Sequence, residues 1–130
     1  MLEFGSEIVG IAVVEKELSA NDISNIIISA IEGGIGYWAR LENIGEDWID
    51  KPSDEPASLW ATKLLLEGKS VEFSDSEDED EIWELTLDKL IDGYAMNYKR
   101  RPHDSNIENG DATTADCIVQ YALFNELVYG

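Results

Sequence analysis

The sequence predicts an α+β fold, in which a small antiparallel sheet packs against about four helices. A β-branched segment near the start predicts an N-terminal strand, and two short alternating segments joined by an acidic link predict a central hairpin. Further segments carry apolar residues at helical spacing. A length of 130 residues is typical of one domain, so we expect a single domain over residues 1–130.

The first strand and the first helix are predicted in the first quarter of the chain. The segment EIVGIAVVEKE, residues 7–17, is rich in β-branched side chains, which favour a strand. Ser19 is expected to cap the following helix, with Asp22 completing its first turn. The glycines at 33–34 end this helix, because glycine accepts the left-handed backbone that follows many helices. Its inner face carries Ile23, Ile26, Ile27, Ala30 and Ile31.

The middle of the chain contains one ambiguous segment and one clear helix. Residues 37–48 approximate helical spacing, but two glycines weaken the pattern, and the structure of this segment stays open. Pro56 opens a helix that runs to about Glu67. Ser53 or Asp54 is its expected cap.

An acidic block lies between two alternating segments. In KSVEF (69–73) and EIWEL (81–85), apolar residues alternate with polar ones, as in half-buried strands. The link SDSEDEDE (74–81) is predicted to be the solvated tip of a hairpin, because carboxylates are rarely buried without a partner. Its charge also protects the hairpin edges from pairing with other chains.

Two helices are predicted in the last third of the chain. Thr86 is the expected cap of the first, and Thr113, with Asp116 in the first turn, is expected to open the second. The loop between them is closed by the turn pair Asn109–Gly110. The inner face of the first of these helices is expected to carry Leu87, Leu90, Ile91, Tyr94 and Tyr98.

The charge of the chain restricts its partners. Twenty-eight acidic residues against nine basic ones give a formal net charge of −19. Such a field repels phosphate backbones and anionic lipid and attracts basic protein surfaces, so we expect neither direct nucleic-acid binding nor membrane binding. The start lacks the pattern of a secretion signal, and the single cysteine, Cys117, excludes an intramolecular disulfide. These features favour a cytoplasmic protein.

Three stretches resemble a known protein family. They are ISAIEGGIGYWARL (28–41), LLLEGKSVEFSDSEDEDEIWELTLDKLIDGYAMNY (64–98) and TTADCIVQYALFNELVYG (113–130). Together they resemble small acidic cytoplasmic proteins from phages and prophages of Gram-positive bacteria, over about residues 23–130. The resemblance implies a viral or mobile-element origin and a host-directed or replication-accessory role, and it supplies no catalytic residues. The acidic link is longer and more charged here than in the family pattern, so the resemblance does not identify it as a shared functional element.

The acidic link is the first candidate site. A calcium loop with Asp75 at its first position needs glycine at the sixth position and glutamate at the twelfth, but Asp80 and Thr86 stand there, so we expect no metal. A solvated loop is the simplest interpretation, and a mimic of a nucleic-acid polyanion is the functional one. The residues expected to bind a basic host protein are Asp75, Glu77, Asp78, Glu79, Asp80 and Glu81.

The segment EGGIGYW is the second candidate site. Its glycines allow a ligand to approach the backbone, and the aromatic side chains can stack on a base, although helix termination explains the same residues more simply. The ligand-binding residues of this alternative are Gly33, Gly34, Tyr37, Trp38 and Arg40, with the Lys99–Arg101 group as further cations. His103 is the single histidine and stands in no nucleophile motif, so we expect neither a catalytic residue nor a cofactor.

These observations support one main hypothesis. The chain is expected to be a non-enzymatic phage accessory protein in the host cytoplasm that binds and inhibits a nucleic-acid-binding defence protein, of CRISPR or restriction type, by polyanion mimicry. The alternatives are a sponge for a small ligand such as a nucleotide, or a structural or replication component of a phage.

Overall fold

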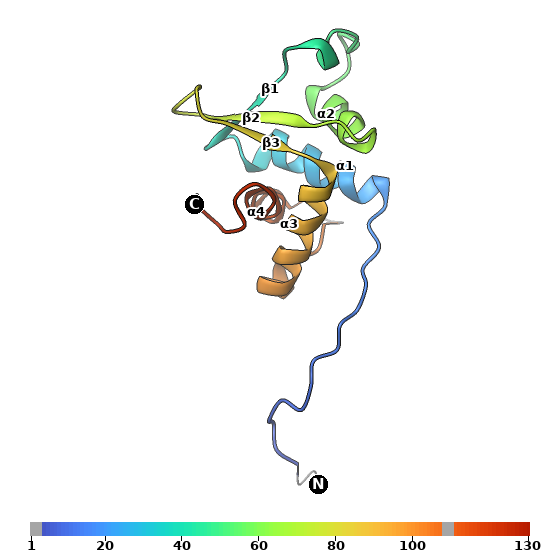
Figure 1. Ribbon diagram of the computed structural model, residues 1–130, viewed down its shortest axis with the longest axis vertical. Coiled ribbons are helices and arrows are strands. Elements are labelled where there is room, and N and C mark those ends of the chain that lie inside the picture. Colours follow the sequence, from blue (N-terminus) through green and yellow to red (C-terminus); the bar gives the residue numbers. More distant parts are fainter. Residues whose placement is uncertain (1–3, 108–110) are drawn as a thin grey trace.

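The computed structural model describes residues 4–107 and 111–130, and it confirms an α+β fold (Figure 1). Within these residues the helices are Ala20–Ser29 (α1), Ala57–Leu66 (α2), Leu87–Arg100 (α3) and Ala112–Phe124 (α4). Shorter turns lie at Ala30–Gly34 (η1, a π-helix), Glu46–Trp48 (η2) and Pro102–Asp104 (η3), the last two of 3-10 type. The strands Ala39–Glu42 (β1), Val71–Asp75 (β2) and Ile82–Leu85 (β3) form one antiparallel sheet in the order β1-β2-β3.

The central hairpin is confirmed as β2 and β3, whereas the predicted N-terminal strand is wrong. The third strand is instead β1, which belongs to the ambiguous segment after η1. The η1 turn ends at Gly34, and the chain then continues into β1, which pairs with β2. Residues 4–17 are extended and exposed, and they lie outside the described strands. The physical reason is that β-branched residues favour a pleated, half-buried surface, but they do not specify which strand will supply it.

The helix starts follow local hydrogen bonds. In α1 the capping box forms as predicted, since Ser19 accepts from the amide of Asp22 (3.1 Å) and Asp22 accepts from the amide of Ser19 (2.9 Å). Thr86 caps α3 by accepting from the amide of Lys89, also as predicted. These caps lie within three residues of the groups they bind, so the sequence is enough to find them.

Two other predicted caps are wrong. The N-cap of α2 is Pro56 itself, without a side-chain hydrogen bond, so neither Ser53 nor Asp54 serves. The cap of α4 is Asp111, which accepts from the amides of Thr113 and Thr114 and so starts the helix ahead of the predicted position. The predicted turn Asn109–Gly110 lies outside the described residues.

The core lies between the sheet and the helices: α1, α3 and α4 occupy the same side of the sheet in Figure 1, and α2 adds Ala61, Leu64 and Leu65. The register places Leu41, Phe73 and Trp83 in one row that faces this layer. Trp38, at the start of β1, is 2% exposed and stacks on Tyr129 with ring centroids 4.9 Å apart. Aromatic rings therefore join the sheet to the end of the chain.

The buried face of α3 matches the predicted one in part, since Leu90 and Tyr94 are buried and Leu87 packs against the core. Ile91 and Tyr98, expected to point inward, are 40% and 48% exposed, while Gly93 and Asn97 are buried. A Cβ atom on Gly93 would lie 2.5 Å from the carbonyl oxygen of Ile118. Glycine thus lets the two helix backbones approach closely, so the buried face is centred near Gly93, and Ile91 and Tyr98 lie at its margin.

Candidate acidic binding face

The outer face of the sheet carries a row of glutamates. The strand register places Glu42 directly opposite Glu72, and Glu72 directly opposite Glu84. Glu72 and Glu84 are exposed and Glu42 is partly exposed. The packed helices lie on the other side of the sheet, so this row points to solvent (Figure 1).

The row is electrostatically unfavourable for the isolated protein. Side chains directly opposite each other on antiparallel strands have Cβ atoms roughly 4.5–5.5 Å apart, and like charges at this distance destabilise a sheet. Glu72 has such a neighbour on both sides. The neighbouring outward row holds Arg40, Ser74 and Ile82. The face therefore keeps three adjacent carboxylates at a cost in stability, which is an arrangement that a basic partner would relieve.

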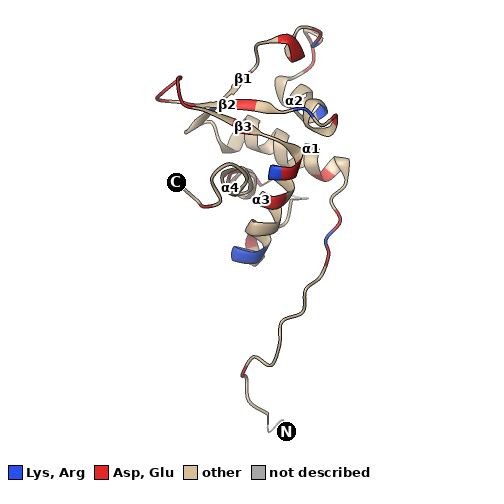
Figure 2. Cartoon of the chain, viewed as in Figure 1, with Lys and Arg blue, Asp and Glu red and all other residues tan. Residues whose placement is uncertain are grey.

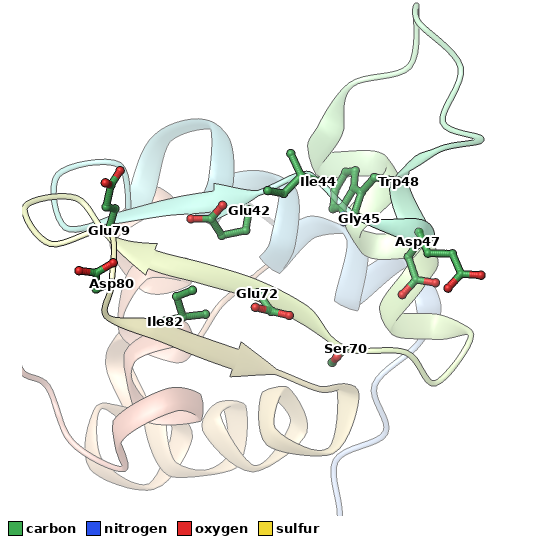
Figure 3. A pocket seen from close by; sticks show the side chains of 11 residues that line it. Glu42, Ile44, Gly45, Asp47, Trp48, Ser70, Glu72, Glu79, Asp80 and Ile82 are labelled. Atoms are coloured by element: carbon green, nitrogen blue, oxygen red, sulfur yellow. The ribbon is translucent and has the colours of Figure 1, made fainter.

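A groove of about 550 Å³ lies over the same face (Figure 3). It extends from the hairpin tip, where Glu79 and Asp80 lie, along the strands to the η2 segment with Asp47 and Trp48. Six of its eleven lining residues are acidic and none is lysine or arginine. The lining residues are Glu42, Ile44, Gly45, Glu46, Asp47, Trp48, Ser70, Glu72, Glu79, Asp80 and Ile82.

Exposed apolar side chains lie among these carboxylates. Ile44 is 78% exposed, Ile82 is 50% exposed, and Trp48 is half-buried. The long side chains of lysine and arginine have apolar stems that pack on such residues while their charged ends remain near the acids. The groove therefore combines the two features that a basic protein segment needs for binding.

The hairpin tip is held in a defined conformation. Asp75 accepts hydrogen bonds from the amide of Glu77 (2.7 Å) and from the hydroxyl of Tyr129 (3.2 Å), and Asp78 accepts from the amide of Asp80 (3.1 Å). Both carboxylate oxygens of Asp75 therefore bind groups of the protein itself. Figure 2 shows the acidic tip at one end of the sheet and the basic end of α3 away from it.

Apart from Asp75, which accepts hydrogen bonds from Glu77 and Tyr129, the predicted partner-binding residues form two groups. Glu79 and Asp80 line the groove, whereas Glu77, Asp78 and Glu81 are exposed on the tip outside it. Sequence reasoning missed the glutamate row and the acids of η2. The alternation in KSVEF and EIWEL already turns Glu72 and Glu84 away from the core, but only the pairing with β1 shows that Glu42 joins them.

The residues of the second candidate site meet only in part. A pocket of about 740 Å³ brings Gly33, Gly34 and Tyr37 together with Arg101. Trp38 is buried in the aromatic cluster, and Arg40 lies on the outer sheet face. The remaining lining residues are Ala112, Thr113, Asp116, Cys117, Gln120, Leu127, Val128, Tyr129 and Gly130.

The polar groups of this pocket already bind one another. Asp116, 8% exposed, accepts from the Tyr37 hydroxyl (2.6 Å), the Trp38 indole nitrogen (2.8 Å) and the Gln120 amide (2.9 Å). Burial and the bond to Asp116 raise the pKa of Tyr37 to about 12. Burial also raises the pKa of Cys117, against the opposing effect of Arg101, so its thiol stays protonated at neutral pH. This network explains the residues structurally, without a ligand.

The described residues contain no cluster of the kind that binds a metal ion. Across residues 4–107 and 111–130, no three histidine, cysteine or carboxylate side chains gather as a metal ion would require. His103 is exposed on η3, and no described helix is long and apolar enough to cross a membrane. No protein-family model, curated protein or solved structure matches the chain.

Proposed function

We propose that this chain is a phage-encoded accessory protein that inhibits a host nucleic-acid-binding defence protein, of CRISPR or restriction type, by occupying its basic surface. The observation that supports this proposal is the open sheet face, where Glu42, Glu72 and Glu84 form one row beside an acidic groove. The protein acts by binding, without catalysis, in the cytoplasm of the host cell.

The spacing of the carboxylates supports mimicry of a nucleic acid. Adjacent strands lie about 4.8 Å apart, which sets the spacing of the glutamate row. A single DNA strand carries one charge per roughly 3.4 Å of helix axis, so the two charge densities are similar. The hairpin tip continues the negative surface beyond the row. A groove that binds a phosphate backbone through lysine and arginine therefore meets a comparable array of charges.

Competition with DNA tests the proposal. The chain is titrated into complexes of labelled duplex DNA with purified defence proteins, namely CRISPR effector nucleases and restriction endonucleases. We expect displacement of DNA from a member of this panel, with an affinity that falls steeply as salt rises. The triple variant Glu42→Gln, Glu72→Gln, Glu84→Gln should raise the Kd at least about tenfold.

A control variant separates the site from net charge. Glu17→Gln, Asp92→Asn and Glu126→Gln remove the same number of charges from exposed positions outside the row and the groove. This control should leave the affinity within about twofold, because the long-range field alone changes little. Equal losses in the two triple variants, or no displacement of DNA from any member of the panel, would contradict the proposal.

The nucleotide sponge remains a second candidate because the pocket joins Gly33, Gly34 and Tyr37 to the guanidinium of Arg101. A ligand there would have to displace Cys117 and Asp104 from Arg101, which donates hydrogen bonds to both. Thermal melts with a panel of cyclic nucleotides distinguish this function, since saturating ligand at about 100 times Kd stabilises a protein by ~2.7 kcal/mol.

A further inference from the structure

The N-terminal arm, residues 4–17, has the side chains of a buried strand but is exposed. Figure 1 shows it leaving the start of α1 and extending away from the body. All of its described residues are exposed, and its larger apolar side chains are between 75% and 96% exposed. These side chains are Phe4, Ile8, Val9, Ile11, Val13 and Val14.

The centre of the arm is suited to pairing as a strand. Residues 8–14 contain no charged side chain in a chain of net charge −19. In a strand, Val9, Ile11 and Val13 would share one face, and Ile8, Gly10, Ala12 and Val14 would lie on the other. The unbroken apolar row of Val9, Ile11 and Val13 suits a strand that covers a core on one side.

The sheet has two edges that a further strand can join. At β3 the carbonyl of Glu84 accepts a hydrogen bond from the Lys89 ammonium (2.8 Å), and lysine at an edge opposes strand addition. At β1 the alternation of the antiparallel ladder turns the N–H and C=O of Leu41 away from β2, because Trp38, Arg40 and Glu42 face it. Leu41 itself is only half-buried.

We propose that two copies of this chain exchange arms, each arm pairing as a fourth strand with β1 of the other copy. In this arrangement Val9, Ile11 and Val13 extend the core-facing side of the sheet beyond Leu41. The arm begins beside Tyr94 and Tyr98 of α3, where Lys16 lines a groove with them, and it points away from its own sheet. A second copy is therefore the acceptor that its direction favours.

The available area is sufficient for a dimer. An apolar side chain of this size buries roughly 60–120 Å² of apolar surface. With three such side chains of each arm on the core-facing side, the two arms bury about 360–720 Å². The acceptor surfaces that they cover lose a similar area, so the total of about 700–1,400 Å² reaches the roughly 1,200–2,000 Å² of stable interfaces. Reciprocal exchange also closes the assembly with two-fold symmetry, so it ends at two copies.

Charge gives the dimer a characteristic salt dependence. Each body is strongly acidic, so the bodies repel each other when the uncharged arms bring them together. Salt screens this repulsion and strengthens apolar burial, so the dimer should tighten as salt rises. Binding of a basic partner to the acidic face responds in the opposite direction, which makes the two interactions separable.

Sedimentation equilibrium of the full chain, at two salt concentrations, tests the exchange. The wild-type chain should be a dimer, and Ile11→Asp should raise its dissociation constant at least about 100-fold, because each dimer would bury two unpaired carboxylates. Ser6→Asp adds the same charge outside the apolar segment and should leave the dimer intact. The thermal transition of the body checks that both variants fold, since the arm lies outside the packed core.

Hydrogen exchange identifies the acceptor strand. In the dimer, the alternate amides of residues 8–14 that face β1 and the amide of Leu41 should become protected together as concentration rises. A wild-type chain that stays monomeric in both salts, or a dimer that survives Ile11→Asp, would overturn the proposal. Protection of the arm without protection of Leu41 would also overturn it, because the arm would then pair elsewhere.

Discussion

At the scale of single residues, Asp116 shows how an acidic protein places a carboxylate in its interior. Three uncharged side chains, Tyr37, Trp38 and Gln120, each donate a hydrogen bond to it. Hydrogen bonds of this kind offset much of the cost of removing a carboxylate from water. Gln120 also accepts from the amides of Val128 and Tyr129, so one network fixes β1, α4 and the C-terminal segment together.

Gly93 is the residue on which the packing of α3 against α4 depends. The substitution Gly93→Ala gains up to about 1 kcal/mol of helix propensity. Its new Cβ, however, would lie 2.5 Å from the oxygen of Ile118 and 2.7 Å from the nitrogen of Ala122, so the helices must move apart. We expect a net loss of about 2 kcal/mol or more in the free energy of unfolding, measured by urea denaturation.

Gly36→Ala is the matched control for this change. No atom lies within 4 Å of the Cβ it would add, and its backbone is not left-handed. Its free energy of unfolding should stay within about 0.5 kcal/mol of the wild type. If Gly93→Ala is equally mild, the close helix approach is not a constraint on the fold.

Gly93 also illustrates what sequence patterns miss. In the sequence, glycine within a helical segment only lowers the helix propensity, so the periodicity predicts that the large apolar side chains form the inner face. A close contact between two helices depends on both surfaces, and no local pattern reports the carbonyl of Ile118. For the same reason the prediction that Ile91 and Tyr98 point inward is wrong, and both are substantially exposed.

At the scale of elements, the glutamate row leads to a prediction about stability. Glu72→Gln removes the central charge and with it two directly opposed pairs, with Glu42 and with Glu84. At about 0.2–1 kcal/mol for each pair, the variant should be more stable than the wild type by about 1 kcal/mol at low salt. Thermal and urea unfolding measure this, and the same variant should bind a basic partner less well.

Salt and a second variant test the cause of this gain. High salt screens the repulsion between exposed carboxylates, so the difference between Glu72→Gln and the wild type should shrink as salt rises. Glu126→Gln removes one exposed charge outside the row and should gain much less. A gain that persists in high salt would show that side-chain packing, rather than charge, is responsible.

The elements differ in how far the sequence predicts them. The caps of α1 and α3 and the β2–β3 hairpin are local, with partners close along the chain, and all of them form as predicted. The third strand is not local, since β1 pairs with residues thirty or more positions away. The arm has the stronger strand composition, yet η1 places the weaker segment beside β2. The glutamate row follows from that pairing, so the sequence revealed the acidic tip but not the face.

At the scale of the whole molecule, the acidic, basic and uncharged regions lie in different places. Acids concentrate on the outer sheet face and the hairpin tip, the basic residues Lys99–Arg101 lie at the far end of α3, and the arm is uncharged over 8–14 (Figure 2). The proposed binding of a basic protein and the proposed exchange of arms therefore use different surfaces. One interaction weakens with salt and the other strengthens, so both can operate in one molecule without competing.

Alkaline pH should destabilise the whole molecule through its tyrosines. Burial raises the pKa of Tyr37, Tyr94 and Tyr129, and hydrogen bonds to Asp116 and Asp75 raise the pKa of Tyr37 and Tyr129 further. A pKa that is higher in the folded state means that the folded protein holds the proton more tightly. The contribution of these tyrosines to the free energy of unfolding is therefore fully present below pH 10, the ordinary pKa of tyrosine. It is lost as pH rises through the higher pKa values of the folded state.

Tyr37→Phe makes this dependence measurable, because the pKa of Tyr37 is about 12 when folded. Between pH 10 and 12 the wild type should lose stability more steeply than the variant. The difference between the two slopes of unfolding free energy against pH should be well below ~1.4 kcal/mol per pH unit. That value applies when unfolding releases one whole proton from a fully buried group, whereas Tyr37 is 56% exposed. At neutral pH the variant should be about 1 kcal/mol less stable, because Asp116 loses a donor. Urea unfolding across this range provides both values, and equal slopes in the two proteins would show that Tyr37 does not hold its proton through Asp116.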